Sequence, residues 1–269
     1  MIKHWIVTGD THGLSGVYKR IEMIFSKSLI NPKESALIIL GDAGFNFWLT
    51  NNERNRKKDL GKYGLYIYCV RGNHEERPEN LGYNLIYDEN VCGEVYLDAD
   101  CEYIRYFQDG GEYIIDGYDV LTIGGAYSVD KNYRIAAAGG VEGSGWFPGE
   151  QLTESEKVAI EEKVQDKYYD FVLTHTCPIQ WEPRDLFLPF IDQDSVDKTT
   201  EKWLSKISQN IRWVIWCFGH YHASRAESPC VQQFYGDFAT LHDIFECWTG
   251  DDKQWQYLHK SPNFWGEEN

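Results

Sequence analysis

Five short apolar segments of this chain are each followed, within a few residues, by Asp, Asn or His side chains. The segments cover residues 2–8, 36–40, 65–70, 170–174 and 212–218. Their length and apolar content predict buried strands, and helical stretches separate the first three of them. Alternation of strand and helix is typical of a parallel sheet, whose functional residues gather where the strands end. We therefore expect these polar side chains to line one edge of a sheet.

The polar residues that follow the segments are of types that bind metals. They are Asp10 and His12, then Asp42, then Asn73 and His74, then His175, and finally His220 and His222. Glycine stands beside four of these five groups, and glycine allows a sharp turn or a close approach of the backbone to a ligand. Each group alone has a plainer interpretation, because Asp after a strand often caps a helix and His often ends a strand. The ordered set of all five makes those separate interpretations much weaker.

The remaining sequence predicts a mixed α/β architecture in one domain over residues 1–269, with a peripheral tail from about residue 251. Helical spacing covers residues 17–27, 51–62 and 195–207, and a further helix is expected after the capping-box pair Thr153 and Glu156. The turn signals Asp109-Gly110-Gly111 and Asp116-Gly117 predict antiparallel hairpins in the middle of the chain. Residues 230–248 are expected to form closing strands.

Charge and cysteine usage narrow the class of protein. A formal net charge of −16 argues against a broad surface for nucleic acid or anionic membrane. A small anionic substrate remains compatible if cations, such as bound metals, sit in the site. The seven cysteines include no C-x-x-C pair, no apolar run approaches the ~18 residues of a membrane span, and the first residues do not show the charged and apolar pattern of a secretory leader. We expect a cytoplasmic protein with free thiols; its oligomeric state is not readable from the sequence.

The chemistry of the polar set favours two metal ions. Carboxylates can bridge two cations, neutral imidazoles suit first-row divalent metals, and an amide oxygen adds a neutral ligand. The absence of Cys from the set argues against a structural zinc site. Two ions roughly 3.5–4 Å apart can clamp a phosphoryl group and generate a hydroxide for in-line attack. An additional histidine can then protonate the leaving oxygen.

Five ordered motifs resemble those of the calcineurin-like metallophosphoesterase superfamily. They are "GDTHG" at 9–13, "GD" at 41–42, "GNHE" at 72–75, the single His175, and "GHYH" at 219–222. The segment from "TIGGAYSVDKNYR" to "GWFPGEQLT" is also similar to small bacterial and phage members. The resemblance implies a four-layer α/β/β/α sandwich of two mixed β-sheets flanked by helices. It further implies a phosphoesterase in which a hydroxide bridging the metals attacks phosphorus.

The resemblance also implies roles for individual residues. Asp10, His12 and His222 would bind one metal, Asp42 would bridge, and Asn73, His175 and His220 would complete the second site. His74 would be the general acid or orient the phosphate, with Glu75 in a supporting position. Arg71 would contact phosphate, although a surface arginine at a strand end is an equal alternative, and Arg134, Tyr221 and Arg225 are further candidates for the pocket. The ions would be Mn²⁺, with Fe, Zn, Ni and Co as alternatives.

The second motif departs from the pattern of protein phosphatases and dinucleoside-polyphosphate hydrolases. Those branches carry an arginine soon after it, whereas this chain reads "GDAGFNFW". The aromatic residues Phe45, Phe47, Trp48 and Tyr133 would stack on a base or, more simply, pack against a neighbouring helix. We therefore prefer a small nucleotide-type ester as substrate, with monoester or diester left open. A Ser/Thr phosphoprotein phosphatase-like enzyme and a non-catalytic scaffold of the same fold are the alternatives.

Overall fold

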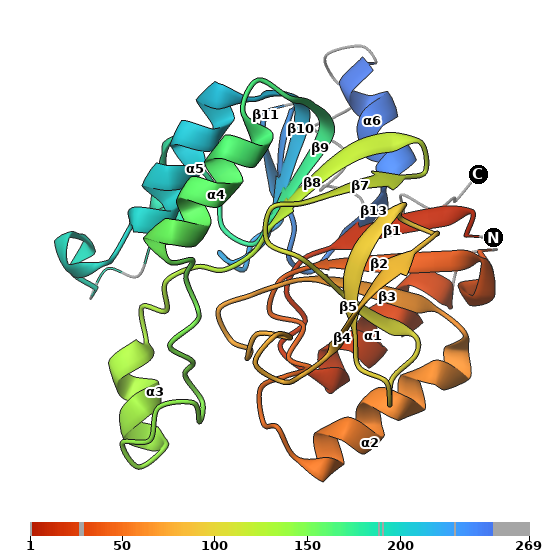
Figure 1. Cartoon of the computed structure of the whole chain (residues 1–269), viewed down its shortest axis with the longest axis horizontal. Helices are drawn as coiled ribbons and strands as arrows, with labels where there is room; N and C mark the ends of the chain where they lie inside the picture. The colour runs from red at the N-terminus through yellow and green to blue at the C-terminus, as the bar shows by residue number, and fades with distance from the viewer. Residues whose placement is uncertain (1, 27–29, 188, 190, 229, 250–269) are drawn as a thin grey trace.

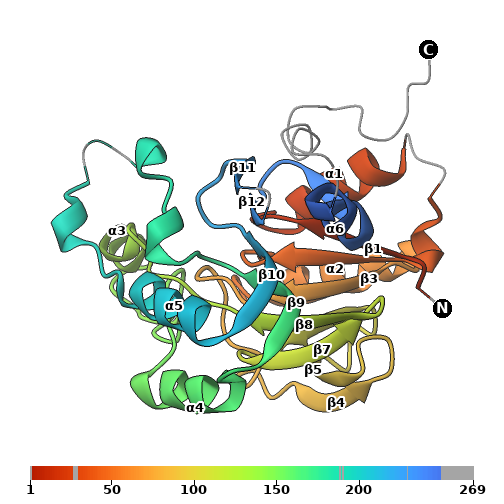
Figure 2. The same cartoon turned by 90° about the horizontal axis from the view of Figure 1, so that it is seen from above.

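Two β-sheets face each other, and helices cover their outer faces (Figures 1 and 2). The structure is a computed structural model that describes the chain apart from residues 1, 27–29, 188, 190, 229 and 250–269. The tail expected from about residue 251 lies outside the described residues. The predicted four-layer α/β/β/α sandwich is confirmed.

The first sheet has seven strands and contains the first three apolar segments of the sequence. Its order is β13 (Phe238–Thr240), β1 (His4–Thr8), β2 (Ser35–Leu40), β3 (Tyr66–Val70), β6 (Ile104–Phe107), β5 (Gly93–Leu97) and β4 (Asn84–Asp88). The four strands β1, β2, β3 and β6 are parallel, so their carboxyl ends meet at one edge. The remaining three strands are antiparallel to their neighbours.

The second sheet has six strands and holds the last two segments. Its order is β11 (Arg225–Ser228), β12 (Val231–Gln233), β10 (Arg212–Phe218), β9 (Tyr168–Thr174), β8 (Tyr118–Ile123) and β7 (Gly111–Ile115). Strands β8, β9, β10 and β12 are parallel. The two sheets pack through a shared apolar core in which Val7 and Ile38 of the first sheet belong to the same cluster as Phe171 and Ile215 of the second.

Helices close the two outer faces. The six α-helices of the described chain are α1 (Leu14–Phe25), α2 (Asn51–Asp59), α3 (Lys131–Ala137), α4 (Glu154–Val164), α5 (Thr199–Asn210) and α6 (Leu241–Thr249). Helix α1 covers the first sheet through Val17, Ile21 and Ile24. Helices α4 and α5 cover the second sheet through Ile160 and Ile207. The capping box predicted at the start of α4 is confirmed, because Thr153 and Glu156 bond each other's backbone reciprocally.

Two local expectations were wrong. Asp109-Gly110-Gly111 does not close a hairpin, since β6 lies in the first sheet and β7 in the second; the turn carries the chain across the sandwich. The hairpin at Asp116-Gly117 does form, between β7 and β8. The closing strands expected over residues 230–248 give way at Leu241 to helix α6, whose first turn is capped by Thr240.

Candidate metal centre

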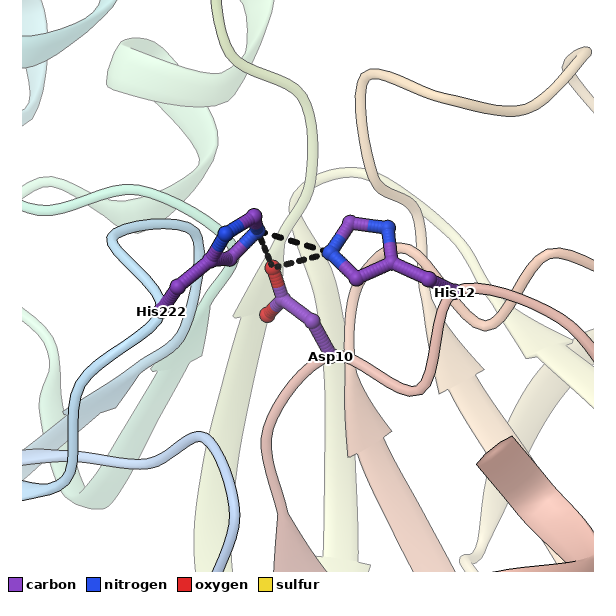
Figure 3. A group of neighbouring side chains, drawn as sticks. All are labelled: Asp10, His12 and His222. Atoms are coloured by element: carbon purple, nitrogen blue, oxygen red, sulfur yellow. Dashed lines mark hydrogen bonds and ion pairs between the residues drawn. The ribbon is translucent and has the colours of Figure 1, made fainter.

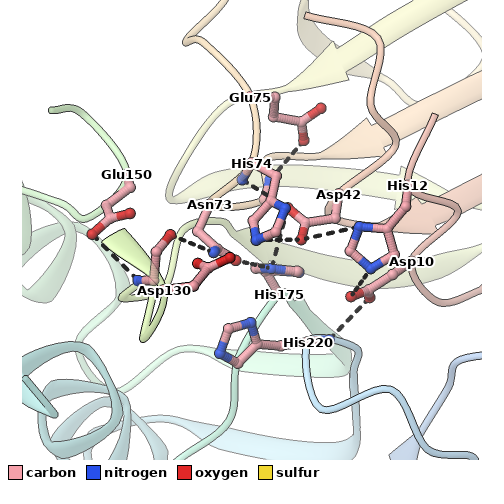
Figure 4. Close-up of polar contacts among 12 residues, drawn as sticks. Asp10, His12, Asp42, Asn73, His74, Glu75, Asp130, Glu150, His175 and His220 are labelled. Carbon is pink, nitrogen blue, oxygen red and sulfur yellow. Dashed lines mark hydrogen bonds and ion pairs between the residues drawn. The ribbon is translucent and has the colours of Figure 1, made fainter. Parts of the chain in front are cut away.

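The predicted site residues come together where the carboxyl ends of the parallel strands of one sheet lie next to those of the other sheet (Figure 4). Asp10, Asp42 and Asn73 follow β1, β2 and β3 of the first sheet. His175 and the pair His220 and His222 follow β9 and β10 of the second sheet. Parallel strands bring their carboxyl ends to one edge, and the face-to-face packing of the sheets brings the two edges together. The centre is therefore built from residues that lie up to 212 positions apart in the chain.

The backbone is unusual at four of these residues. His12, Asp42, His220 and His222 have φ values of 47°, 48°, 68° and 52°. Such left-handed backbone is uncommon for residues other than glycine and costs on the order of 1 kcal/mol or more per residue. Strained backbone of this kind concentrates at functional sites, where the surrounding structure holds a side chain in a required direction.

The neighbouring glycines make room for the site. A Cβ atom at Gly41 would overlap the ring of His175, and one at Gly72 would overlap the carboxylate of Asp42. A Cβ atom at Gly219 would likewise overlap the carboxylate of Asp10. These glycines are needed because ligand-type side chains of one motif pack directly on the backbone of another motif.

A first cluster consists of Asp10, His12 and His222 (Figure 3). The Nε2 atoms of His12 and His222 are 2.7 Å apart, and they lie 3.7 and 3.5 Å from Oδ2 of Asp10. The other carboxylate oxygen, Oδ1, accepts the backbone N–H of His220 at 2.9 Å. Oδ2 has no hydrogen-bond partner in the described structure although the residue is only 2% exposed. An orphaned buried oxygen beside two imidazole nitrogens fits a cation.

A second cluster joins His175 to Asn73. Nδ1 of His175 donates to the carbonyl of Leu40 at 2.8 Å, which leaves Nε2 to offer its lone pair. The amide nitrogen of Asn73 donates to Ser128 at 2.8 Å, which orients its carbonyl oxygen toward Nε2 of His175 at 2.7 Å. Two acceptors at this distance require a proton or a cation between them, so these residues also fit a metal.

Asp42 lies between the two clusters (Figure 4). Its Oδ2 is 3.9 Å from Nδ1 of His12, and its Oδ1 is 3.6 Å from Nε2 of His175. Burial would raise the pKa of this carboxyl, but the surrounding histidines, His74 foremost, hold the pKa below its usual range. A buried carboxylate that is kept ionised between two imidazole clusters can bridge two ions.

The two histidines of the last motif diverge. His222 belongs to the cluster of Asp10, whereas the ring of His220 lies 4.9 Å from the ring of His175, centroid to centroid. Burial lowers the pKa of His220 to about 3, which keeps its imidazole neutral and able to bind a metal. This arrangement is the one expected if each histidine serves a different ion.

His74 lies at the side of the centre with an arginine against it. Its backbone N–H donates to Oδ1 of Asp42 at 2.9 Å, and its Nε2 is 3.8 Å from Oδ2 of that residue. The guanidinium of Arg134, from α3, contacts both ring nitrogens of His74. Burial lowers the pKa of His74 to about 4 despite the opposing charge of Asp42, and Arg134 adds to the lowering. Asp130 holds Arg134 through a 2.7 Å ion pair.

The other candidate residues have separate surroundings. Nε of Arg71 donates to Asp109 at 2.9 Å, and its side chain is 4% exposed, so it is not a surface arginine. Its NH1 donates to the carbonyls of Gly149 and Glu150. Its NH2 is buried and has no hydrogen-bond partner in the described structure, and the predicted phosphate contact of Arg71 stays a prediction. Arg225, on β11, is paired with Asp185 and Glu227.

The aromatic residues after the second motif divide between core and surface. Phe45 is fully buried in the core beneath the first sheet, and Phe47 packs edge-on to Phe147 at 6.3 Å. Trp48 and Tyr133 are 72% and 76% exposed. Packing, the simpler of the two expected roles, therefore describes Phe45 and Phe47.

Comparison with known families agrees with the geometry. A family model described as calcineurin-like phosphoesterase matches residues 4–224, which contain every residue of both clusters. The chain belongs to the calcineurin-like phosphoesterase family. No curated protein matches it. Among solved structures, the protein of unknown function AQ665 from Aquifex aeolicus is 14% identical over 64% of this chain and 80% of that one. The TM-score of 0.27 is too low for that likeness to support an argument.

Several residues that shape the centre of this calcineurin-like phosphoesterase escaped sequence analysis. Ser128 orients the amide of Asn73, and Glu150 accepts the backbone N–H of Ser128 at 3.3 Å. The carbonyl of Leu40 fixes the ring of His175. A backbone carbonyl carries no sequence signal, and Ser128 and Glu150 lie in loops whose approach to the site depends on the tertiary fold.

No helix in the described part of the chain is long and apolar enough to cross a membrane.

Proposed function

We propose that this calcineurin-like phosphoesterase is a two-metal enzyme that hydrolyses a small phosphate ester in the cytoplasm, with Mn²⁺ as the metal and no nucleic-acid or membrane partner. The proposal rests on one observation: in two adjoining clusters, nitrogen and oxygen atoms that carry lone pairs lie 2.7 Å apart. Asp10, His12 and His222 would hold one ion, and Asn73, His175 and His220 the other, with Asp42 between them. Bound there, the ions would supply positive charge for the phosphoryl oxygens and lower the pKa of the attacking water.

The protein residues would divide the remaining work. Nε2 of His74 lies 3.8 Å from Oδ2 of Asp42, and His74 lines the cavity beside the centre, where it can hydrogen-bond the leaving oxygen. A bound phosphate brings negative charge to His74, and a nearby opposite charge favours the protonated imidazole that general-acid catalysis needs. Arg134, which contacts His74, is the cation best placed to meet a phosphate oxygen. Asp130 keeps that guanidinium oriented.

The substrate that we propose is small and of the nucleotide type. A cavity of about 420 Å³ opens beside His74, His220 and His222, and its size suits a nucleoside rather than a protein segment. The missing arginine after Asp42 and the net charge of −16 add weight against phosphoprotein and polymeric nucleic acid. Both mono- and diesters are compatible with the same ligand set.

A panel of phosphate mono- and diesters, assayed with Mn²⁺, Fe²⁺, Zn²⁺, Ni²⁺ and Co²⁺, tests the proposal. Asp42→Ala should abolish hydrolysis of every substrate. His74→Ala should reduce kcat by ~10²–10⁴-fold on alkyl esters and by much less on 4-nitrophenyl esters, whose leaving group needs little protonation. His242→Ala, at an exposed position on α6, is the matched control and should keep full activity. A metal-loaded protein that hydrolyses none of these esters would refute the proposal.

A further inference from the structure

The cavity beside the metal centre has a second wall that the proposed chemistry does not use. Besides residues of the centre, it is lined by residues 127–130 after β8 and by described residues of the stretches 182–187 and 191–201, which precede and begin α5. Helices α3 and α5, which adjoin these residues, lie on the same side of the molecule (Figures 1 and 2). A substrate whose phosphate sits at the centre would extend its leaving group between these segments.

Much of this wall is apolar. Val129, Leu186, Phe187 and Val196 line it together with Tyr221, the residue between the two histidines of the last motif. The rings of Phe187 and Tyr221 lie nearly parallel, at 29°, with centroids 6.3 Å apart. Apolar and aromatic walls of this kind bind an organic group by burial and stacking.

The charged residues of the wall are mostly acidic. Four carboxylates outside the metal centre line the cavity: Asp130, Glu182, Asp197 and Glu201. Lys198 is the one cationic side chain among the described lining residues, and its Nζ is 3.0 Å from Glu182 and 4.6 Å from the centroid of Phe187.

Two arginines near the cavity do not change this balance. Arg134 pairs with Asp130 at 2.7 Å, and Arg225 pairs with Asp185 at 2.8 Å. Neither arginine is among the lining residues. Asp130 and Glu182 are each paired with a cation, so the net negative charge of this half of the cavity comes from Asp197 and from Glu201 in its ionised form.

Glu201, a buried residue of the cavity wall, adds to the preference for a cationic or hydrogen-bond-donating ligand. The residue is 4% exposed, and its Oε1 accepts the hydroxyl of Thr176 at 2.9 Å. Its other oxygen, Oε2, has no hydrogen-bond partner in the described structure. A buried carboxylate oxygen without a partner favours a ligand that brings a hydrogen-bond donor or a positive charge.

We propose that this cavity selects the leaving group by charge: it accepts an uncharged or cationic organic group with a planar or apolar body, and it rejects a group that carries a second anion. The inference rests on the proposed function and adds the substrate class. A nucleoside or an amine-bearing aromatic alcohol fits this description, whereas a polyphosphate, a bisphosphate or an acidic peptide does not. Like charges held close together in a partly buried site oppose binding.

Three aryl phosphates of matched shape provide the test: 4-methylphenyl, 4-(aminomethyl)phenyl and 4-(carboxymethyl)phenyl phosphate. One methylene separates each charge from the ring, so the phenols leave with similar ease. We expect kcat/KM for the aminomethyl ester to exceed that for the carboxymethyl ester by at least ~10-fold, with the methyl ester between them. Glu182→Gln, which leaves Lys198 uncompensated, should reduce the ratio by ~5-fold or more. Glu22→Gln, on the exposed face of α1, is the control and should leave it unchanged.

A binding measurement separates this inference from the proposed function. Calorimetric titration of the metal-free protein with 4-(aminomethyl)phenol and with 4-hydroxyphenylacetate requires no catalysis, and the amine should bind more tightly by a similar factor. Equal hydrolysis of all three esters together with equal binding of both phenols would overturn the inference and leave the proposed function standing. Failure to hydrolyse any ester would overturn the proposed function, and the binding ratio would then decide the inference alone.

Discussion

At the scale of single residues, the centre depends on backbone conformations that most side chains avoid. Asp42 has φ of 48°, a conformation that favours glycine, and the preceding residue, Gly41, has φ of 89°. The carboxylate is required at that point because it faces both clusters. The neighbouring packing holds the residue there, since Gly72 approaches so closely that a Cβ would overlap the Asp42 side chain.

This conformation predicts an unusual order of stability among variants of Asp42. Asp42→Gly and Asp42→Ala both remove the carboxylate, but only glycine adopts φ of 48° without strain. The glycine variant should therefore be more stable than the alanine variant by about 1 kcal/mol in urea unfolding. Asp59, with φ of −61° at the end of α2, should give the reverse order, because glycine is the weaker helix former. The same order at both positions would contradict the strain at Asp42.

Arg71 gives a second prediction at this scale. Its guanidinium is tied to Asp109 and to two loop carbonyls, so Arg71→Gln should lower the free energy of unfolding by about 3 kcal/mol. Combining it with Asp109→Asn should restore part of the loss, because the unpaired buried carboxylate is then removed. Unchanged stability with a raised KM for phosphate esters would instead support the phosphate contact predicted from the sequence.

The ligand-type residues could be predicted because each is Asp, Asn or His and follows an apolar segment that predicts a strand. The residues that orient them could not. The hydrogen bonds from Asn73 to Ser128 and from His175 to Leu40 span 55 and 135 positions of the chain. Contacts at such separations follow from the packing of the two sheets, which one sequence does not specify.

At the scale of elements, buried strands were easier to predict than the pieces between them. Strand β2 (Ser35–Leu40) is buried at every position, as a continuous apolar run suggests. Helix α6 was expected as strand because a segment of nine residues with five apolar ones is too short for periodicity to separate strand from helix. Its Leu241 and Ile244 are spaced for one helix face and pack into the core between the sheets. Helix α3, which brings Arg134 to His74, contains no buried residue and so has no apolar pattern to reveal it.

Helix α5 carries the element-scale prediction, through Glu201 in its first turn. Burial raises the pKa of this carboxyl to about 7, from 4.5 in an ordinary setting. The folded protein then binds more protons than the unfolded chain between these two values, so stability falls as the pH rises through this window. Relative to Glu201→Gln, the wild type should lose up to about 3 kcal/mol between pH 4.5 and pH 8. Urea unfolding across this range measures the difference, and parallel curves would contradict the raised pKa.

At the scale of the whole molecule, the centre joins two sheets that also meet through a shared apolar core and through contacts such as the hydrogen bond from Tyr113 to the carbonyl of Glu94. Asp10, Asp42 and Asn73 extend from the first sheet, and His175, His220 and His222 from the second. Four of these side chains belong to groups whose ligand atoms lie within 4.8 Å of one another. Without cations, the closely spaced nitrogen and oxygen lone pairs repel each other, and the buried Oδ2 of Asp10 has no partner. Both effects destabilise the contact between the two sheet edges.

Metal binding should therefore stabilise the entire fold rather than one loop. At ~100 times Kd, a single ion adds about 2.7 kcal/mol to the free energy of unfolding, which corresponds to a rise in Tm of about 5–10 °C for a chain of this size. Hydrogen exchange should slow at the carboxyl ends of both β2 and β9 when Mn²⁺ is added, because ligands from both sheets are then held together. Asp42→Asn should lose most of the rise in Tm, whereas Asp59→Asn, on the exposed face of α2, should retain it. Protection confined to the ends of one sheet would show that the ions do not join the two halves of the sandwich.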